Sequence, residues 1–164
     1  MELLTPSYTA SVHTNRTRWY IGALFTFLAT GKDTNGQFAY IEALMRKGLE
    51  PPPHMHTKED ETFYLLEGEV KMFVGDHECY LKPNEFIYLP KNIPHRFEIQ
   101  TDTARMLIHT SPAGLEEMFF ALSIPAEKLE LPPRPSGPPS TEFLQKLGAL
   151  QQQYGIVPQL KKEA

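Results

Sequence analysis

The chain has 164 residues, of which 41% are hydrophobic and 22% are charged, and its formal net charge is −4. A chain of this length forms one ordinary domain and can bury a core without disulfides. Its mildly acidic balance gives no reason to expect nucleic acid or an anionic membrane as a partner.

The sequence carries no sign of secretion or membrane insertion. Cys79 is the single cysteine, and we expect it to be a small buried apolar residue. The N-terminus lacks the basic start and apolar stretch of a secretory signal. The longest largely apolar run, residues 20–29, is far shorter than the ~20 residues that cross a bilayer. We therefore expect a cytoplasmic protein without membrane contact.

Short runs rich in aromatic and β-branched residues fill the middle of the chain. Turn-forming residues separate them, for example at 31–36, 75–76 and 82–84. About eight short strands at this spacing predict an all-β sandwich or small barrel. The predicted strands are residues 19–30, 37–46, 62–66, 70–74, 78–81, 86–89, 95–99 and 105–109.

The segments on either side of this region differ from it in pattern. Residues 1–17 are polar and irregular, and they predict an N-terminal arm. Residues 113–164 form a C-terminal extension with a short helix expected at 114–123. A proline-rich connector follows at 125–139, where an extended conformation is expected.

A longer helix is predicted after the connector. Ser140 or Thr141 can cap its start, and Gly155 fits a stop just after Tyr154. Its apolar residues fall on one stripe, which is typical of a helix packed along one side. Two roles stay open for it: a surface element that covers the barrel, or a contact between two subunits.

Four residues together predict a metal site. Side chains alternate along a strand, so His54 and His56 point the same way and can share one ion. Glu61 opens the next predicted strand, and His95 supplies a third imidazole downstream. An H-x-H pair alone is more often exposed to solvent than bound to metal. The prediction therefore depends on the spacing of all four residues.

That spacing resembles the first sequence motif of the cupin family. Gly48, His54, His56, Glu61 and Gly68 stand at every fixed position of this motif.

The second cupin motif is matched less completely. Pro90 to His95 resembles its Pro-x-Gly-x-x-His core, but Asn92 stands where the motif has glycine. Asparagine tolerates the left-handed backbone conformation better than most residues, so this change is mild. Asn84 replaces the leading glycine of the motif, and Ile99 replaces its closing asparagine.

The resemblance implies a cupin jelly-roll β-barrel, an all-β fold, over residues 18–112, with one divalent transition metal. The family's ligands carry over to His54, His56, Glu61 and His95. Three imidazoles and one carboxylate suit Fe, Mn, Ni, Co or Zn, so the identity of the ion stays open. Four protein ligands leave positions free on an octahedral ion, which implies a reactive metal rather than a purely structural one.

Strand alternation also predicts the lining of the pocket beside the metal. If Glu61 and His95 point inward, the side chains two residues further along the same strands do so too. The pocket residues predicted in this way are Phe63, Leu65 and Phe97, and Met72 is added because an outward Lys71 on the strand at 70–74 leaves Met72 inside. Such an apolar and aromatic lining suits a flat aromatic ligand better than a phosphorylated sugar.

A closer resemblance points to one group of cupins. Residues 19–24, 33–36, 51–54 and 59–63 are similar to bacterial quercetinase-type monocupins, which are flavonol 2,4-dioxygenases. This resemblance implies a dioxygenase that acts on an aromatic or enolic small molecule with O2. Glu61 would then be catalytic and take the proton of an enolic hydroxyl. Similar cupins are often dimers, so we expect a homodimer.

Two other functions stay open. A sugar isomerase or epimerase would need Arg or Lys inside the pocket. Arg96 and Arg105 are the basic residues near the second motif, and alternation points Arg96 away from His95. The other alternative is a metal-containing module that binds a small ligand without turnover.

Overall fold

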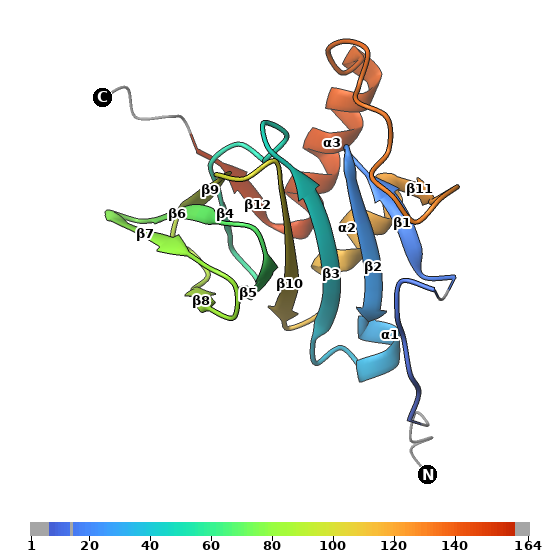
Figure 1. The fold of residues 1–164 in the computed structure, drawn as a ribbon, viewed down its shortest axis with the longest axis horizontal. Helices are drawn as coiled ribbons and strands as arrows, with labels where there is room; N and C mark the ends of the chain where they lie inside the picture. The colour runs from blue at the N-terminus through green and yellow to red at the C-terminus, as the bar shows by residue number, and fades with distance from the viewer. Residues whose placement is uncertain (1–6, 14, 160–164) are drawn as a thin grey trace.

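The computed structural model describes residues 7–13 and 15–159. Within these residues, the strands form two antiparallel sheets (Figure 1). The first sheet has the order β11 (Ser123–Pro125), β1 (Thr17–Tyr20), β2 (Ala23–Ala29), β3 (Ala39–Arg46), β10 (Thr103–Ser111), β5 (Asp60–Glu67) and β8 (Phe86–Leu89). The second has the order β12 (Ile156–Pro158), β4 (His54–His56), β9 (His95–Ile99), β6 (Val70–Val74) and β7 (His77–Leu81).

The hydrophobic core lies between the inner faces of the two sheets. Every second residue of β3 is buried, from Ala39 to Met45, and β5 alternates in the same way. Val70 and Met72 of β6 are fully buried in the same cluster as Ile41 of β3. Side chains of both sheets thus fill one interior, which confirms the predicted all-β fold.

Three strands have the bounds that the sequence predicts, namely β6, β8 and β9. The run predicted at 19–30 is divided into β1 and β2 by a turn at Ile21 and Gly22, whose φ angles are 42° and 81°. The φ angle of Gly22 favours glycine, and a Cβ there, 2.7 Å from Leu49 Cδ1, would also require the Leu49 side chain to move.

The loop expected at 31–36 contains a short helix, α1 (Gly31–Thr34). Its Asp33 carboxylate accepts hydrogen bonds from the Thr30 backbone N–H and hydroxyl, both at 2.9 Å. Arg16 donates to the same carboxylate at 2.7 and 3.0 Å. These bonds cap the first turn and attach it to the N-terminal segment, an arrangement that local sequence does not reveal.

The C-terminal extension folds back over the barrel. Helices α2 (Leu115–Ala121) and α3 (Thr141–Tyr154) pack on each other, and α2 also packs on β1 (Figure 1). As predicted, Ser140 caps α3 by accepting from the Phe143 N–H at 3.1 Å, and Gly155 ends the helix with φ 77°. The three-residue strands β11 and β12 were not expected, because segments this short show no alternation.

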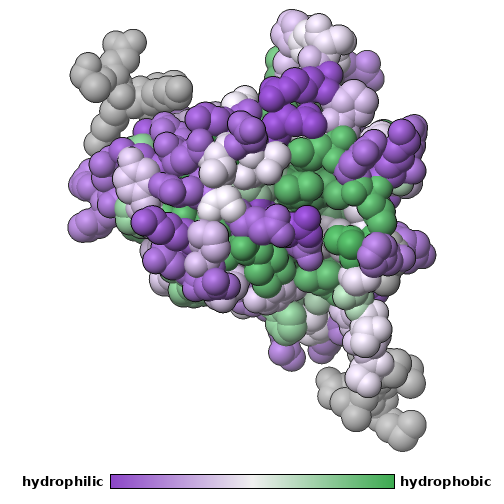
Figure 2. All heavy atoms as spheres, viewed as in Figure 1, coloured by the Kyte–Doolittle hydropathy of each residue, from purple (hydrophilic) through white to green (hydrophobic). Residues whose placement is uncertain are grey.

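The connector between α2 and α3 crosses near the outer face of the larger sheet. Trp19 Nε1 donates to the Glu130 carbonyl at 2.8 Å, and Arg46 donates to the Pro132 carbonyl at 3.1 Å. Figure 2 shows apolar side chains gathered on the visible face of the molecule, over β2 and its neighbours. In the described part of the chain, no helix is long and apolar enough to cross a membrane.

The prediction for Cys79 is wrong, because its side chain is exposed. It lies on β7, the last strand of the smaller sheet, where residues 77–80 are all exposed. An edge strand that no further layer covers exposes both of its faces, which sequence composition alone does not reveal.

Candidate metal centre

The four residues predicted as metal ligands come from three strands in the two sheets. His54 and His56 stand at the two ends of β4, and His95 begins the neighbouring strand β9. His54 lies directly opposite His95 in the β4–β9 pair. One ring nitrogen from each of the three histidines lies within 4.8 Å of those of the other two. This spacing is short enough for one ion to contact all three rings.

Glu61 reaches the same point from β5 of the other sheet. Its Oε2 atom lies 3.5 Å from His56 Nε2 and 3.4 Å from His95 Nε2. Glu61, His56 and His95 are each no more than 5% exposed. Within the described residues, His56 Nε2 and His95 Nε2 are buried without a hydrogen-bond partner. Buried polar atoms without partners are uncommon, and a metal ion between them would satisfy both.

Hydrogen bonds on the far sides of the rings orient two of the histidines. His54 Nδ1 lies 2.8 Å from the Pro52 carbonyl, and His95 Nδ1 lies 3.3 Å from the Ile93 carbonyl. A carbonyl oxygen can only accept, so each Nδ1 is the protonated nitrogen. Each Nε2 therefore has its lone pair free for a metal.

The turn before His95 keeps its shape despite the departure from the motif. Asn92 adopts a left-handed conformation with φ 65°, as glycine would. Its backbone N–H donates to the His56 carbonyl at 2.7 Å. The turn that presents His95 is thereby attached to the strand that carries His54 and His56.

The protonation states of His54 and Glu61 suit a cation at the centre. Burial, together with the nearby His95 ring, lowers the pKa of His54 to about 4, so His54 is neutral near pH 7. Burial raises the pKa of Glu61, but the neighbouring His56 and His95 rings outweigh it and bring the pKa below its usual value. The site therefore offers a carboxylate and a neutral imidazole, both of which are metal ligands.

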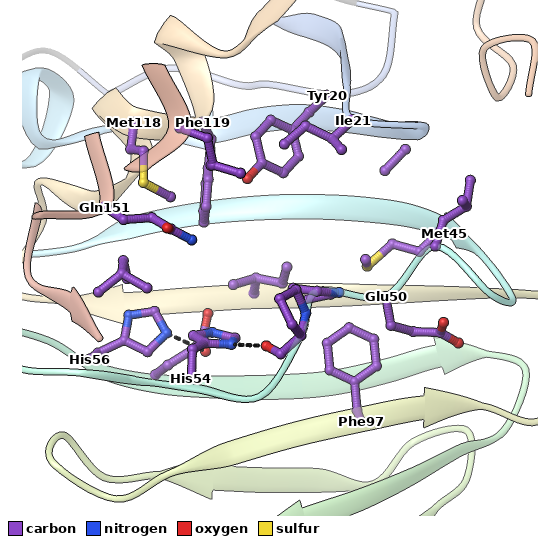
Figure 3. Close-up of a pocket in the computed structure, with 18 of the residues that line it drawn as sticks. Tyr20, Ile21, Met45, Glu50, His54, His56, Phe97, Met118, Phe119 and Gln151 are labelled. Atoms are coloured by element: carbon purple, nitrogen blue, oxygen red, sulfur yellow. Dashed lines mark hydrogen bonds and ion pairs between the residues drawn. The ribbon is translucent and has the colours of Figure 1, made fainter. Parts of the chain in front are cut away.

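A cavity of about 340 Å³ opens onto this cluster, lined in part by His54, His56 and Glu61 (Figure 3). Phe63 and Phe97 line it as predicted, with their rings edge to face and centroids 5.6 Å apart. The rest of the wall is mainly apolar. A cavity of this size and lining fits a small, largely apolar ligand.

The prediction for Leu65 and Met72 is corrected by the structure. Both side chains point inward, but both are fully buried in the hydrophobic core and neither lines the cavity. Alternation predicts the face of a strand on which a side chain lies, not its depth. At the depth of Leu65 and Met72, side chains of the two sheets fill the interior.

Three polar residues of the cavity wall were not predicted from the sequence: Tyr20, Glu50 and Gln151. Tyr20 lies at the end of β1 and Gln151 on α3, more than a hundred positions apart in the chain. Strand alternation cannot relate such distant residues. For Tyr20, the similarity of residues 19–24 to quercetinase-type cupins was the available signal.

Basic side chains stay outside the cavity. Among the described residues, no Arg or Lys lines it. The guanidinium of Arg96 instead lies 3.5 Å from the centre of the Phe73 ring, and Arg105 pairs with Glu42 at 3.0 Å. The cavity therefore lacks the positive charge that a phosphorylated ligand needs.

Sequence comparisons agree with this geometry. The Cupin_2 family, described as a cupin domain, matches residues 40–110. The chain is 31% identical over 127 residues to a quercetin 2,3-dioxygenase from Bacillus subtilis, which covers 77% of this chain and 38% of that protein. It is 26% identical over 106 residues to a quercetin 2,3-dioxygenase from Aspergillus japonicus, covering 60% of this chain and 30% of that protein. The chain thus spans less than half the length of these curated relatives.

Solved structures share the fold at much lower identity. KdgF from Halomonas sp. superposes with a TM-score of 0.60 at 15% identity, covering 69% of this chain and 99% of that one. At such an identity, the likeness concerns the arrangement of strands and not the chemistry of the site.

Proposed function

Because the chain is a cupin with quercetinase-like relatives, we propose that it is a metal-dependent dioxygenase acting on an aromatic or enolic small molecule. One observation supports this proposal more strongly than any other. Three histidines and Glu61 converge beside an apolar, aromatic cavity, which His54, His56 and Glu61 line and no described basic residue lines. The same absence of positive charge disfavours an isomerase or epimerase of sugar phosphates.

The histidines would hold the metal through their Nε2 atoms, with Glu61 as the fourth ligand. This donor set suits Fe, Mn, Ni, Co or Zn. When bound, such an ion supplies a Lewis acid with open positions for the substrate and O2.

The walls of the cavity would position the substrate. The Phe63 and Phe97 rings offer flat apolar surfaces beside the histidines, so an aromatic ring can bind there and exclude water. Glu61 faces the same space as a carboxylate. It would accept the proton of the enolic hydroxyl of the substrate at a carboxylate oxygen, which makes the substrate a better electron donor.

Comparison of the wild type with Glu61→Gln tests this proposal. Protein loaded with each metal in turn is mixed with quercetin under air, and O2 consumption and CO release are followed. Glutamine keeps the shape of the side chain but cannot accept the proton, so we expect kcat to fall ~10²- to 10⁴-fold. Metal content, measured for each sample, separates the loss of the base from loss of the ion.

A matched control is Glu127→Gln, which removes an exposed carboxylate on the connector. This variant should turn over quercetin like the wild type. If the wild type binds flavonols with every metal but consumes no O2, the protein is a binding module. If Glu61→Gln retains full turnover with full metal content, Glu61 is not the base.

A further inference from the structure

The cavity wall has polar atoms that the metal site does not use. In the described part of the chain, the polar side chains lining it besides the metal ligands are Tyr20, Glu50 and Gln151. Both carboxylate oxygens of Glu50 are already engaged, since they accept from the Ile99 N–H at 2.8 Å and the Gly48 N–H at 2.9 Å. Glu50 is therefore a structural residue that secures the loop before His54.

Tyr20 and Gln151 have no such partners. Within residues 7–13 and 15–159, neither the Tyr20 hydroxyl nor the Gln151 side-chain amide makes a hydrogen bond. Both groups point into the cavity, with His54 and His56 below them in the view of Figure 3. Polar groups in an apolar cavity lose free energy unless something in the cavity bonds to them. Their capacity for hydrogen bonds is thus directed at the occupant.

The Tyr20 ring is held in place by two other aromatic rings. The centroid of Phe25 lies 4.7 Å away and that of Phe119 lies 5.1 Å away. Burial raises the pKa of Tyr20 above its ordinary value, so the hydroxyl stays protonated and can donate a hydrogen bond. A fixed ring with a protonated hydroxyl presents this donor in one place.

Gln151 is also held on a fixed element. Near its C-terminal end, α3 is joined to the loop after β4, where Lys58 Nζ donates to the Gln153 carbonyl at 2.7 Å. Lys146 of α3 donates to the Ala121 carbonyl of α2 at 2.9 Å. A helix anchored at both places can present a side chain with little loss of entropy on binding.

We propose that Tyr20 and Gln151 determine specificity in this pocket by hydrogen-bonding hydroxyl groups on the outer rings of an aromatic ligand. This inference rests on the proposed function for the aromatic nature of the ligand. The hydroxyl and the amide each donate and accept, so they select a polyhydroxylated aromatic over a bare one. Gln151 lies outside the region that matches the cupin family, so the C-terminal extension contributes to recognition.

Two ligands and two variants test the inference. Quercetin and 3-hydroxyflavone share the enolic hydroxyl, but only quercetin has hydroxyls on the outer rings. Dissociation constants are measured by fluorescence titration of Zn-loaded protein without O2, so no turnover interferes. Tyr20→Phe and Gln151→Leu should each weaken quercetin binding about 5- to 20-fold, because each removes one hydrogen bond in an apolar site. Binding of 3-hydroxyflavone should change less than about twofold, because it lacks the outer-ring hydroxyls and its remaining polar groups, the 3-hydroxyl and the 4-carbonyl, would face the metal.

Matched controls are Tyr80→Phe on the exposed edge strand β7 and Gln152→Leu on the exposed side of α3. Neither should alter binding of quercetin or 3-hydroxyflavone. Equal losses for both ligands in Tyr20→Phe and Gln151→Leu, or no loss for either, would overturn the inference. So would a wild type that binds neither ligand.

The experiments distinguish failure of the recognition role from failure of the proposed dioxygenase activity. Hydroxyl-dependent binding without O2 consumption by the metal-loaded protein would support the recognition role of Tyr20 and Gln151 and would refute only the dioxygenase. Turnover that is unaffected by either variant, with unchanged quercetin affinity, would support the dioxygenase and refute the recognition role.

Discussion

Glu59 is a buried carboxylate that reaches the candidate metal site only through another residue. It is 2% exposed, and its Oε2 atom lies 3.8 Å from His56 Nδ1. Burial lowers the pKa of His56, but Glu61 and Glu59 raise it more, so the net shift is upward. A carboxylate behind a ligand histidine fixes the orientation of the ring and its tautomer. The two atoms are too far apart for a direct hydrogen bond, so we predict that Glu59 positions His56 through the charge of its carboxylate.

Replacing Glu59 by Gln should lower metal affinity about 10- to 100-fold, the usual effect of removing such a partner. The affinity can be measured by competition with a chelator of known strength. The melting temperature of the metal-free variant should stay close to that of the wild type, since glutamine keeps the volume of the side chain. Glu127→Gln serves again as the control. An unchanged affinity in Glu59→Gln would show that Glu59 does not position His56.

Single residues were predictable from the sequence where local geometry decides their place. His54 and His56 share a face because they lie two residues apart on β4, and Phe63 lies two residues after Glu61. Leu65 lies on the same face of β5 as Glu61 and Phe63. Its depth in the core depends on the side chains of the opposing sheet, which local sequence does not reveal. The interactions that place Tyr20 and Gln151 join distant parts of the chain, so no local pattern could predict them.

At the scale of elements, the C-terminal strand supports the strand that carries two histidines. β12 pairs with β4 in register, with Ile156 opposite His56 and Pro158 opposite His54. The Thr57 N–H and hydroxyl both donate to the Gly155 carbonyl at 2.9 Å. β4 therefore has a partner on each side, although it is only three residues long.

Gly155→Ala should weaken this support. The residue has φ 77°, and a Cβ there would lie 2.4 Å from Thr57 Oγ1 and 3.1 Å from Lys58 Cγ, so both side chains would have to shift. We expect the free energy of unfolding, measured in urea, to fall by about 1–3 kcal/mol, from left-handed strain plus the clash. If the new methyl group displaces Thr57, the neighbouring His56 should also shift, and metal affinity should fall.

Gly148→Ala provides a matched control within α3. Gly148 lies inside the helix, and a Cβ there would meet nothing within 4 Å. Because alanine favours helix over glycine, this variant should be as stable as the wild type or more stable by up to about 1 kcal/mol. Equal stability of the two alanine variants would contradict the proposed strain at Gly155.

The sequence predicts some helices and strands and not others. The bounds of α3 follow from a cap at Ser140, an apolar stripe and a stop at Gly155, all of which are local signals. β11 and β12 exist because a neighbouring strand offers hydrogen bonds, not because their own residues alternate. Three-residue segments with a proline carry no periodic signal, so their pairing depends on tertiary contacts.

Over the whole molecule, the candidate metal site joins the two sheets. His54, His56 and His95 lie on the smaller sheet, and Glu61 lies on the larger one. The sequence predicted a sandwich or small barrel because short β-rich runs alternate with turn residues, and the resemblance to the cupin motifs narrowed this to a cupin barrel. It did not predict that residues of β1 and α3 line the same cavity, because these two distant elements are brought together by packing on α2.

An ion bound between the sheets should stabilise the whole fold, since an unfolded chain cannot hold four ligands around one point. Binding to the folded state alone adds about 2.7 kcal/mol when the free metal is 100 times its Kd. For a chain of this size, that corresponds to a rise of roughly 5–11 °C in Tm. The rise should vanish when a chelator is added.

The variants His95→Gln and His77→Gln test whether the stabilising ion binds at the candidate metal centre or elsewhere. His95 is a candidate ligand, whereas His77 is exposed on the edge strand β7. Calorimetry with Ni or Zn should give the full rise in Tm for His77→Gln and little for His95→Gln. An equal rise in the two variants would mean that the stabilising ion binds elsewhere. Loss of the whole rise in Tm in His95→Gln would show that the stabilising ion depends on His95 and so links β9 to the rest of the barrel.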